Sequence, residues 1–173
     1  MADWPRHKDN CVPVVISEVG EKGRGLVAAR DIKVGERILI DSVVISVEST
    51  KLSGVMTRKA VRSLKEQIQA LPAEKASQFQ NLKSGCITFS ERDLKTLRQE
   101  KCFNEMKIFL SNKIERCNYE DKEDWDVLFL VLSLINHSCA PNVEDSYLTG
   151  ESEDQETVEE YELRAVRDIS NQG

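Results

Sequence analysis

Residues 11–49 alternate short runs of valine and isoleucine with single glycines. β-Branched residues bounded by glycine are typical of strands joined by tight turns. We therefore predict short strands over residues 14–16, 25–28 and 37–47. The glycines that punctuate them are Gly20, Gly23, Gly25 and Gly35.

Residues 54–117 carry the spacing of apolar residues that a helix buries on one face. Four of them recur at intervals of three and four: Val61, Leu64, Ile68 and Leu71. Pro72 should end this helix, and a short second helix is predicted over residues 74–82. Ser90 and Asp93 form a capping box for a third helix. Four of its residues are expected to face inward: Leu94, Leu97, Met106 and Leu110.

Strand character returns from Trp125 onward. Residues 143–148 and 158–166 are predicted to form a hairpin across the acidic loop 150–160. Such a charge run is typical of a solvated turn, with a protein-binding role as the alternative. Helices between two strand-rich zones indicate an α+β fold, in which several small curved sheets flank a helical insert.

Two segments of the chain echo each other. Arg-Asp-Ile-Lys-Val-Gly over residues 30–35 resembles Arg-Asp-Ile-Ser-Asn-Gln-Gly over residues 167–173. In each copy a predicted strand runs into a turn closed by glycine. A further apolar strand follows only the first copy, and a sheet without its return strand leaves a neighbour unpaired. We therefore expect the fold to be incomplete at its C-terminal end.

The bulk composition narrows the classes of function. A chain of 173 residues with 40% hydrophobic and 31% charged residues is typical of one soluble globular domain. Its net charge of −6 argues against direct nucleic-acid binding, which normally needs a basic face. The longest apolar run, residues 127–135, is about half a membrane span, and the first residues hold no secretory signal.

The cysteines predict reduced thiols in the cytoplasm or the nucleus. They are five in number and widely spaced: Cys11, Cys86, Cys102, Cys117 and Cys139. None of them forms a Cys-x-x-Cys pair, so we expect no zinc site built from this chain alone.

Two short motifs could carry chemistry. The string Asn-His-Ser-Cys-Ala-Pro-Asn over residues 136–142 follows an apolar run, so it places polar groups at the edge of the core, where they need partners. Asn136 and His137 can each read a purine edge or fix a neighbouring backbone. In the second motif, Gly23 and Gly25 flank Arg24 and permit close backbone approach to a ligand. A lone Gly-x-Gly is most often a simple turn.

Together these motifs resemble the SET domain of protein lysine methyltransferases. The signature string of that family is matched without a gap by residues 136–142, and its Gly-x-Gly turn by residues 22–26. The resemblance covers roughly residues 12–170. Within the family, the helical insert is most similar to the SET-and-MYND branch, although the zinc-binding MYND module is absent. The implied organisation is a tail (1–11) and a SET domain (12–173) composed of N-terminal strands (12–49), helical insert (50–124) and C-terminal part (125–173).

The resemblance implies S-adenosylmethionine as the cofactor and a protein lysine, in a histone or another protein, as the substrate. Gly23 and Gly25 would let the backbone wrap the cofactor, with Lys22 or Arg24 near its carboxylate. Asn136 and His137 would hold it by hydrogen bonds. Asn112 would contact its amino-acid end, with a helix cap as the alternative role of that side chain.

The resemblance also implies features that these 173 residues do not contain. The family's catalytic tyrosine is expected beyond Gly173, so cofactor binding and activity are expected to be weak or absent in this chain. Cys139 would bind zinc only with a downstream cysteine-rich tail. The alternatives are a non-catalytic SET-like module that binds cofactor or a protein, and an unrelated α/β scaffold in which residues 136–142 are a buried turn.

Overall fold

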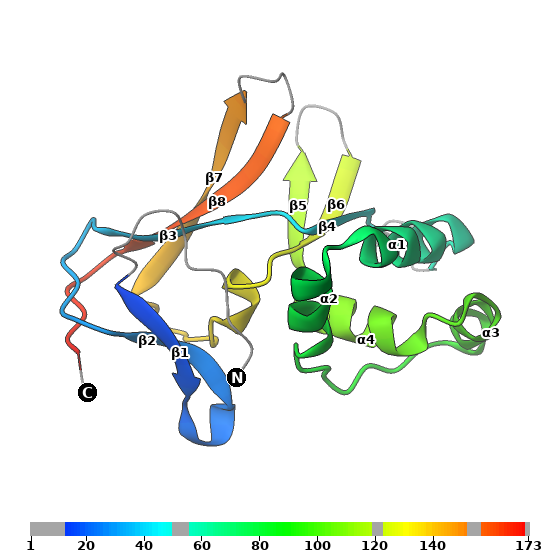
Figure 1. Cartoon of the computed structure of the whole chain (residues 1–173), viewed down its shortest axis with the longest axis horizontal. Helices are drawn as coiled ribbons and strands as arrows, with labels where there is room; N and C mark the ends of the chain where they lie inside the picture. Colours follow the sequence, from blue (N-terminus) through cyan, green and yellow to red (C-terminus); the bar gives the residue numbers. More distant parts are fainter. Residues whose placement is uncertain (1–12, 50–55, 119–122, 152–156, 172–173) are drawn as a thin grey trace. The chain divides into compact units, whose positions relative to one another are not determined.

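The computed structural model describes residues 13–49, 56–118, 123–151 and 157–171. They form small antiparallel sheets and several helices, so the predicted α+β class is confirmed (Figure 1). The strands are β1 (Val14–Glu18), β2 (Arg24–Ala28), β3 (Arg37–Ser42), β4 (Ile45–Glu48), β5 (Ile114–Asn118), β6 (Glu123–Leu128), β7 (Val143–Glu151) and β8 (Thr157–Ala165). The α-helices are α1 (Arg58–Ala70), α2 (Ala73–Gln80), α3 (Glu91–Glu100) and α4 (Phe103–Asn112). The 3-10 turns are η1 (Gly20–Lys22) and η2 (Leu132–Leu134).

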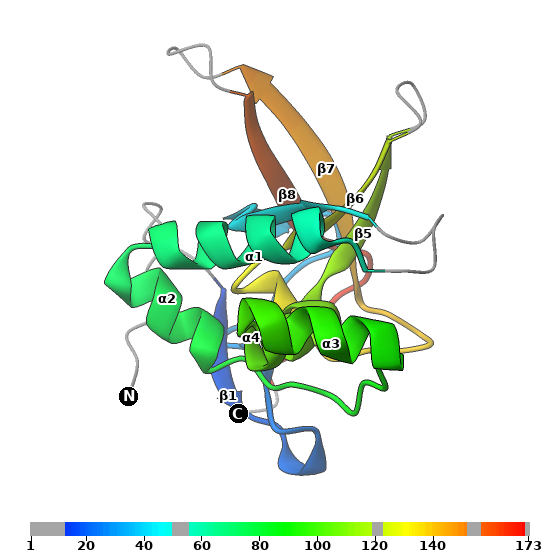
Figure 2. The same cartoon turned by 90° about the vertical axis from the view of Figure 1, so that its right-hand side faces the viewer.

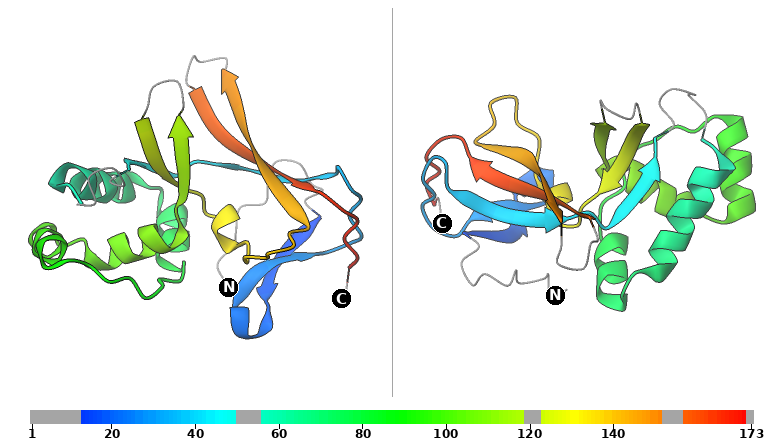
Figure 3. Two further views of the ribbon diagram at one scale, coloured as in Figure 1. Left: turned by 180° about the vertical axis from the view of Figure 1, so that it is seen from behind. Right: turned by 90° about the horizontal axis from the view of Figure 1, so that it is seen from above.

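The chain divides into two compact units, and the first combines an early and a late part of the sequence. Its described residues are 13–43, 134–151 and 157–171. β1 and β2 form a two-stranded hairpin, and a second sheet has the order β3-β8-β7 (Figure 3). The central strand β8 is buried over Tyr161, Glu162 and Leu163 and again at Ala165, with Arg164 exposed between them. Consecutive buried residues are expected in a central strand that is covered on both faces.

The second unit, Val44–Ser133, carries all four α-helices and the sheet β4-β6-β5. α1 packs against β4 and contacts α3 and α4 (Figure 2). The apolar stripe predicted for the first helix is confirmed: Val61 and Leu64 are fully buried, and the helix ends at Ala70 before Pro72. The helix predicted over residues 74–82 is present as α2. The apolar run 127–135 contains the end of β6, the turn η2 and the buried chain between them. Among the described residues, no helix has the length and apolarity to cross a membrane.

The single strand predicted over residues 37–47 is wrong. The structure contains two strands, β3 and β4, which pair with different partners in different sheets. The chain leaves the sheet β3-β8-β7 after Ser42, and the backbone N–H of Val44 already donates to the carbonyl of Leu128 at 2.9 Å. An uninterrupted apolar run carries no information about which strand lies beside it, so the exchange of partners left no mark in the pattern.

The single third helix is also wrong, although its start is confirmed. Ser90 caps α3 by accepting a hydrogen bond from the N–H of Asp93 at 3.1 Å. The helix then ends at Glu100, its C-cap Lys101 adopts a left-handed conformation with φ 51°, and α4 begins after the buried Cys102. Leu97 and Met106 are buried as predicted, one on each helix. The apolar spacing continues from α3 into α4, and no glycine marks the end of α3 as it usually does, so the sequence pattern predicted one helix.

β5 was missed because its sequence has no alternating apolar pattern. Ile-Glu-Arg-Cys-Asn lies inside the zone that was assigned to helix, yet it pairs with β6 over five positions. The strand follows Lys113, whose ammonium lies 2.6 Å from the largely buried carboxylate of Asp126 on β6. A partner that comes later in the chain therefore fixes β5. The predicted hairpin 143–148/158–166 is confirmed as β7 and β8, whose strands extend further into the acidic loop.

Candidate functional site

The glycine turn between β1 and β2 is a tight hairpin. The strands pair from Val14 with Ala28 to Glu18 with Arg24, and the N–H of Val19 donates to the carbonyl of Gly23 at 2.6 Å. Gly23 has a φ of 76°, a conformation that L side chains rarely adopt. The turn geometry alone therefore accounts for glycine at this position.

Gly25 is required for a different reason. Gly25 is a buried residue of β2 and its φ is not in the positive region, so its backbone conformation would permit a side chain. An ideal Cβ there would lie 2.5 Å from Nδ2 of Asn136 and 3.1 Å from Cγ2 of Val19. Both distances are shorter than ordinary contacts. The first half of the Gly-x-Gly motif shapes a turn, and the second half makes room for Asn136.

The signature string runs from half-buried to exposed chain. Asn136 is half-buried, whereas residues 137–142 are exposed. Two bonds from the end of β8 hold the string: the N–H of Val166 donates to the carbonyl of Asn142 at 3.0 Å, and the guanidinium of Arg167 donates to the carbonyl of Ala140 at 2.5 Å. Residues 140–142 are therefore fixed to the C-terminal segment.

A cavity of about 610 Å³ opens within this unit beside Asn136. Apolar residues of its wall come from the β1–β2 hairpin, from the chain around β3 and from β8. Its polar lining comes from the signature string and from the segment after β8: Asn136, Asn142, Arg167, Asp168 and Ser170. A cavity that combines apolar walls with convergent polar groups is the usual form of a small-molecule site.

Charged groups at the cavity wall are ordered by hydrogen bonds. The carboxylate of Asp168 accepts from the Lys33 ammonium at 2.9 Å and from the N–H of Val34 at 3.0 Å. The Lys33 ammonium, and after it the Val34 N–H, hold the pKa of Asp168 below its ordinary value. Asp168 is thus ionised at neutral pH and fastens the wall to the turn before β3.

The structure brings most of the predicted site residues into one unit. Gly23, Arg24, Gly25, Asn136 and His137 all belong to the unit that contains the cavity, and Asn136 lines it directly. Lys22 lies in the hairpin turn. His137 is exposed, with Nε2 of its ring 3.5 Å from the thiol of Cys139.

Asn112 lies in the other unit, as the last residue of α4. Its amide nitrogen donates to the carbonyls of Ile108 at 2.7 Å and Lys83 at 2.8 Å. These bonds satisfy a carbonyl of the last helical turn and fasten the loop after α2. The described contacts are those of a helix terminus, which was the alternative role predicted from the sequence.

Sequence reasoning did not assign Asn142, Arg167, Asp168 or Ser170 to the site, although all four line the cavity. For Asn142 the available signal was its place in the signature string. For the other three it was the internal echo, which singled out residues 167–173 as a counterpart of residues 30–35. Among the described residues, no three His, Cys, Asp or Glu side chains gather as a metal site would require.

One family model covers most of the chain. Residues 23–172 match the SET domain family. No curated protein matches the chain. Among solved structures, the SET domain of LSMT bound to lysine and AdoHcy is similar with a TM-score of 0.60 at 15% identity, covering 96% of this chain and 48% of that one. A candidate histone methyltransferase of Plasmodium falciparum matches with a TM-score of 0.45 at 15% identity, covering 92% of this chain and 85% of that one. The chain therefore spans about half the length of the LSMT structure.

Proposed function

Because the chain belongs to the SET-domain family, we propose that it is an S-adenosylmethionine-dependent protein-lysine methyltransferase domain. The observation that carries this proposal is the close packing of Asn136 against Gly25 beside a cavity of about 610 Å³. The LSMT structure of similar fold holds both lysine and AdoHcy, the demethylated form of the cofactor. This likeness supports the choice of cofactor and substrate class.

The residues around the cavity suit such a cofactor. Its volume falls within the range of roughly 300–1,000 Å³ that small-molecule sites occupy. Apolar wall residues can cover a purine ring, and the Asn136 amide can both donate to and accept from its edge. The guanidinium of Arg167 can pair with a carboxylate. Gly25 keeps open the space that Asn136 occupies.

In this proposal the hairpin backbone at Gly23 and Gly25 faces the cofactor, with Lys22 or Arg24 near its carboxylate. Asn136 and His137 hold it by hydrogen bonds, and the sequence-based assignment of Asn112 to its amino-acid end stays a prediction. The cofactor supplies a methyl group already activated by the sulfonium. The chain's residues align it and exclude water.

The substrate is proposed to be a lysine side chain in a histone or another protein. Its ε-amine, with an ordinary pKa of about 10.4, must lose a proton before it can accept a methyl group. The net charge of −6 supports a basic protein segment as partner over nucleic acid. We also propose that the chain belongs to the SET-and-MYND branch, which the helical segment supports. We propose the cytoplasm or the nucleus as its location.

Binding is the direct test, because no catalytic tyrosine is assigned among the described residues. The chain should be titrated with S-adenosylmethionine and with AdoHcy by calorimetry. We expect saturable binding, weak for this chain, that Asn136→Ala lowers at least about 5-fold, the loss of one hydrogen bond or more. Asn104→Ala, an exposed asparagine of α4, is the matched control and should bind as the parent does. No binding of either ligand would contradict the proposal.

A further inference from the structure

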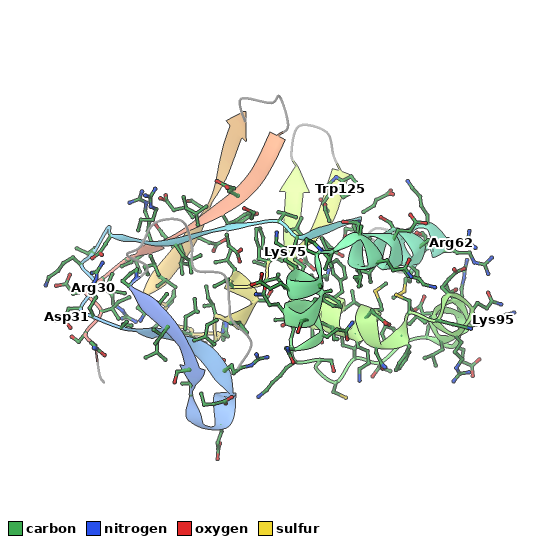
Figure 4. The ribbon with its side chains drawn as sticks, viewed as in Figure 1. Arg30, Asp31, Arg62, Lys75, Lys95 and Trp125 are labelled. Atoms are coloured by element: carbon green, nitrogen blue, oxygen red, sulfur yellow. The ribbon has the colours of Figure 1, made fainter. Side chains whose placement is uncertain are left out.

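The two echoing segments of the sequence lie side by side in the structure. Adding 137 to a residue number in the first segment gives its counterpart in the second, so Asp31 corresponds to Asp168 and Ile32 to Ile169. Ile32 and Ile169 form an antiparallel bridge: each N–H donates to the carbonyl of the other at 2.9 Å. Figure 4 shows Arg30 and Asp31 at the bend that carries the first segment.

The aspartates extend this bridge reciprocally. Asp31 Oδ1 accepts from the N–H of Asn171 at 2.9 Å, and Asp168 Oδ1 accepts from the N–H of Val34 at 3.0 Å. Asn171 is the counterpart of Val34, since both stand three residues after their aspartate. Each aspartate therefore binds the equivalent backbone group of the opposite segment. We call this arrangement, formed by residues 31–34 and 168–171, the aspartate clasp.

The clasp forms part of the cavity wall. Ile32, Asp168, Ile169 and Ser170 all line it. The preceding residues connect the clasp to the signature string, because Val166 and Arg167 bind the carbonyls of Asn142 and Ala140. A shift of residues 168–170 would therefore change both the cavity wall and the position of residues 140–142.

The backbone bonds of the clasp matter more than its ion pair. The Lys33 and Asp168 side chains are 76% and 59% exposed, and exposed ion pairs contribute little to the stability of the fold. The hydrogen bond from the Val34 N–H instead joins the main chain to the Asp168 carboxylate. Asp31 makes the equivalent bond to the Asn171 N–H, although the second segment has Ser170 in the place of Lys33. Acceptance by Oδ1 is thus the feature that the two halves share.

We propose that Asp31 and Asp168 are positioning residues, which hold the wall formed by residues 167–170 in the geometry that binds the cofactor. This inference rests on the proposed function. It assigns a role to two residues that do not need to touch the reacting atoms.

Alanine and asparagine variants separate this role from charge. Asp168→Ala and Asp31→Ala should each raise the dissociation constant for AdoHcy about 5-fold, as expected for one lost hydrogen bond. Asp168→Asn and Asp31→Asn retain the Oδ1 acceptor and should stay within about 2-fold of the parent. Lys33→Ala, which removes the ion pair alone, is the matched control and should do the same.

Amide hydrogen exchange, measured by NMR, tests the clasp without any ligand. Asp168→Ala should speed exchange at Val34, Asp31→Ala should speed it at Asn171, and both should speed it at Ile32 and Ile169. Glu36→Ala controls for the turn, because the Glu36 carboxylate accepts from the Arg30 guanidinium and from the N–H of Lys33, both on its own side of the bridge. That variant should leave the exchange of Asn171 unchanged.

The outcomes are distinguishable. If the parent chain binds no AdoHcy, the proposed function and this positioning role both fail. If the parent binds and the alanine variants bind equally well, only the positioning role fails. Alanine variants that exchange as slowly as the parent at Val34 and Asn171 overturn the clasp itself. Equal losses in alanine and asparagine variants overturn the acceptor argument in favour of charge.

Discussion

The amide of Asn136 occupies the space in which a side chain at Gly25 would lie, with Nδ2 only 2.5 Å from the position of an ideal Cβ. These two residues are 111 positions apart, since 136 − 25 = 111. Their contact brings together the two motifs that the sequence singled out. Asn136 lines the cavity, as does Leu26 next to Gly25, so a change at either residue of the contact should alter the site.

The first prediction concerns Gly25→Ala. The added methyl group must displace the Asn136 amide, and such overpacking costs about 1–3 kcal/mol. We expect the free energy of unfolding to fall by that amount in urea denaturation, together with a loss of cofactor binding. Gly85→Ala is the matched control, because its nearest contact would be an ordinary 3.4 Å to Oγ of Ser111.

The double variant Gly25→Ala/Asn136→Ala tests the cause of that loss. Removing the amide should relieve the overlap, so the two substitutions together should cost less than the sum of the single ones. Strict additivity would contradict the contact, since residues that do not meet lose stability independently.

The second prediction concerns the cysteines. Burial raises the pKa of the Cys102 thiol to about 11, and the residue is fully buried, whereas Cys86 and Cys139 are exposed. The thiolate is the reactive form. Iodoacetamide at pH 8 should therefore modify Cys86 and Cys139 in the folded chain, as measured by peptide mass spectrometry, and Cys102 only in urea. Rapid modification of Cys102 without denaturant would contradict the packing at the α3–α4 junction.

The third prediction decides between the two roles of Asn112. Its amide donates to the carbonyls of Ile108 and Lys83, and two such bonds are worth about 1–2 kcal/mol. Asn112→Ala should lower the free energy of unfolding by that amount. Asn104→Ala, on the same helix and exposed, should change it by less than about 0.5 kcal/mol. A loss of cofactor affinity with unchanged stability would instead support the cofactor role.

The fourth prediction concerns acid pH. The pKa of Asp168 is lowered first by Lys33, and that of Glu36 first by Arg30. Both folded pKa values lie below the ordinary values of about 3.9 and 4.3. The stability that these two carboxylates contribute is therefore fully present above a pH of about 4, and it is lost as the pH falls through the folded pKa values. Carboxyl NMR should show Asp168 titrating below its ordinary value, and Lys33→Ala should raise that pKa. An Asp168 pKa at or above the ordinary value contradicts the contact.

Local sequence was sufficient for elements whose partners are near in the chain. The stripe through Val61 and Leu64, the stop at Pro72 and the cap at Ser90 were all readable, because each acts within a few residues. Elements set by distant partners were not. The change of sheet between Ser42 and Ile45 depends on β8 and β6, which lie more than 75 residues later.

The site was partly readable for the same reason. Asn136 was singled out because a polar group at the end of an apolar run needs a partner, and Gly25 because glycine permits close approach. Neither residue alone showed that it would meet the other. The wall residues Arg167 and Asp168 were visible only as an echo of residues 30–31, and their place beside the cavity follows from pairing across 137 positions.

The central claim is that Gly25 and Asn136 border a cofactor site, and a ¹⁵N NMR titration with AdoHcy tests it most directly. The account predicts saturable shifts at the Gly25 amide, the Asn136 side-chain amide and the Ile169 amide, with Gly85 and Asn104 unchanged. Saturable shifts confined to other residues, with Gly25 and Asn136 unmoved, would contradict it.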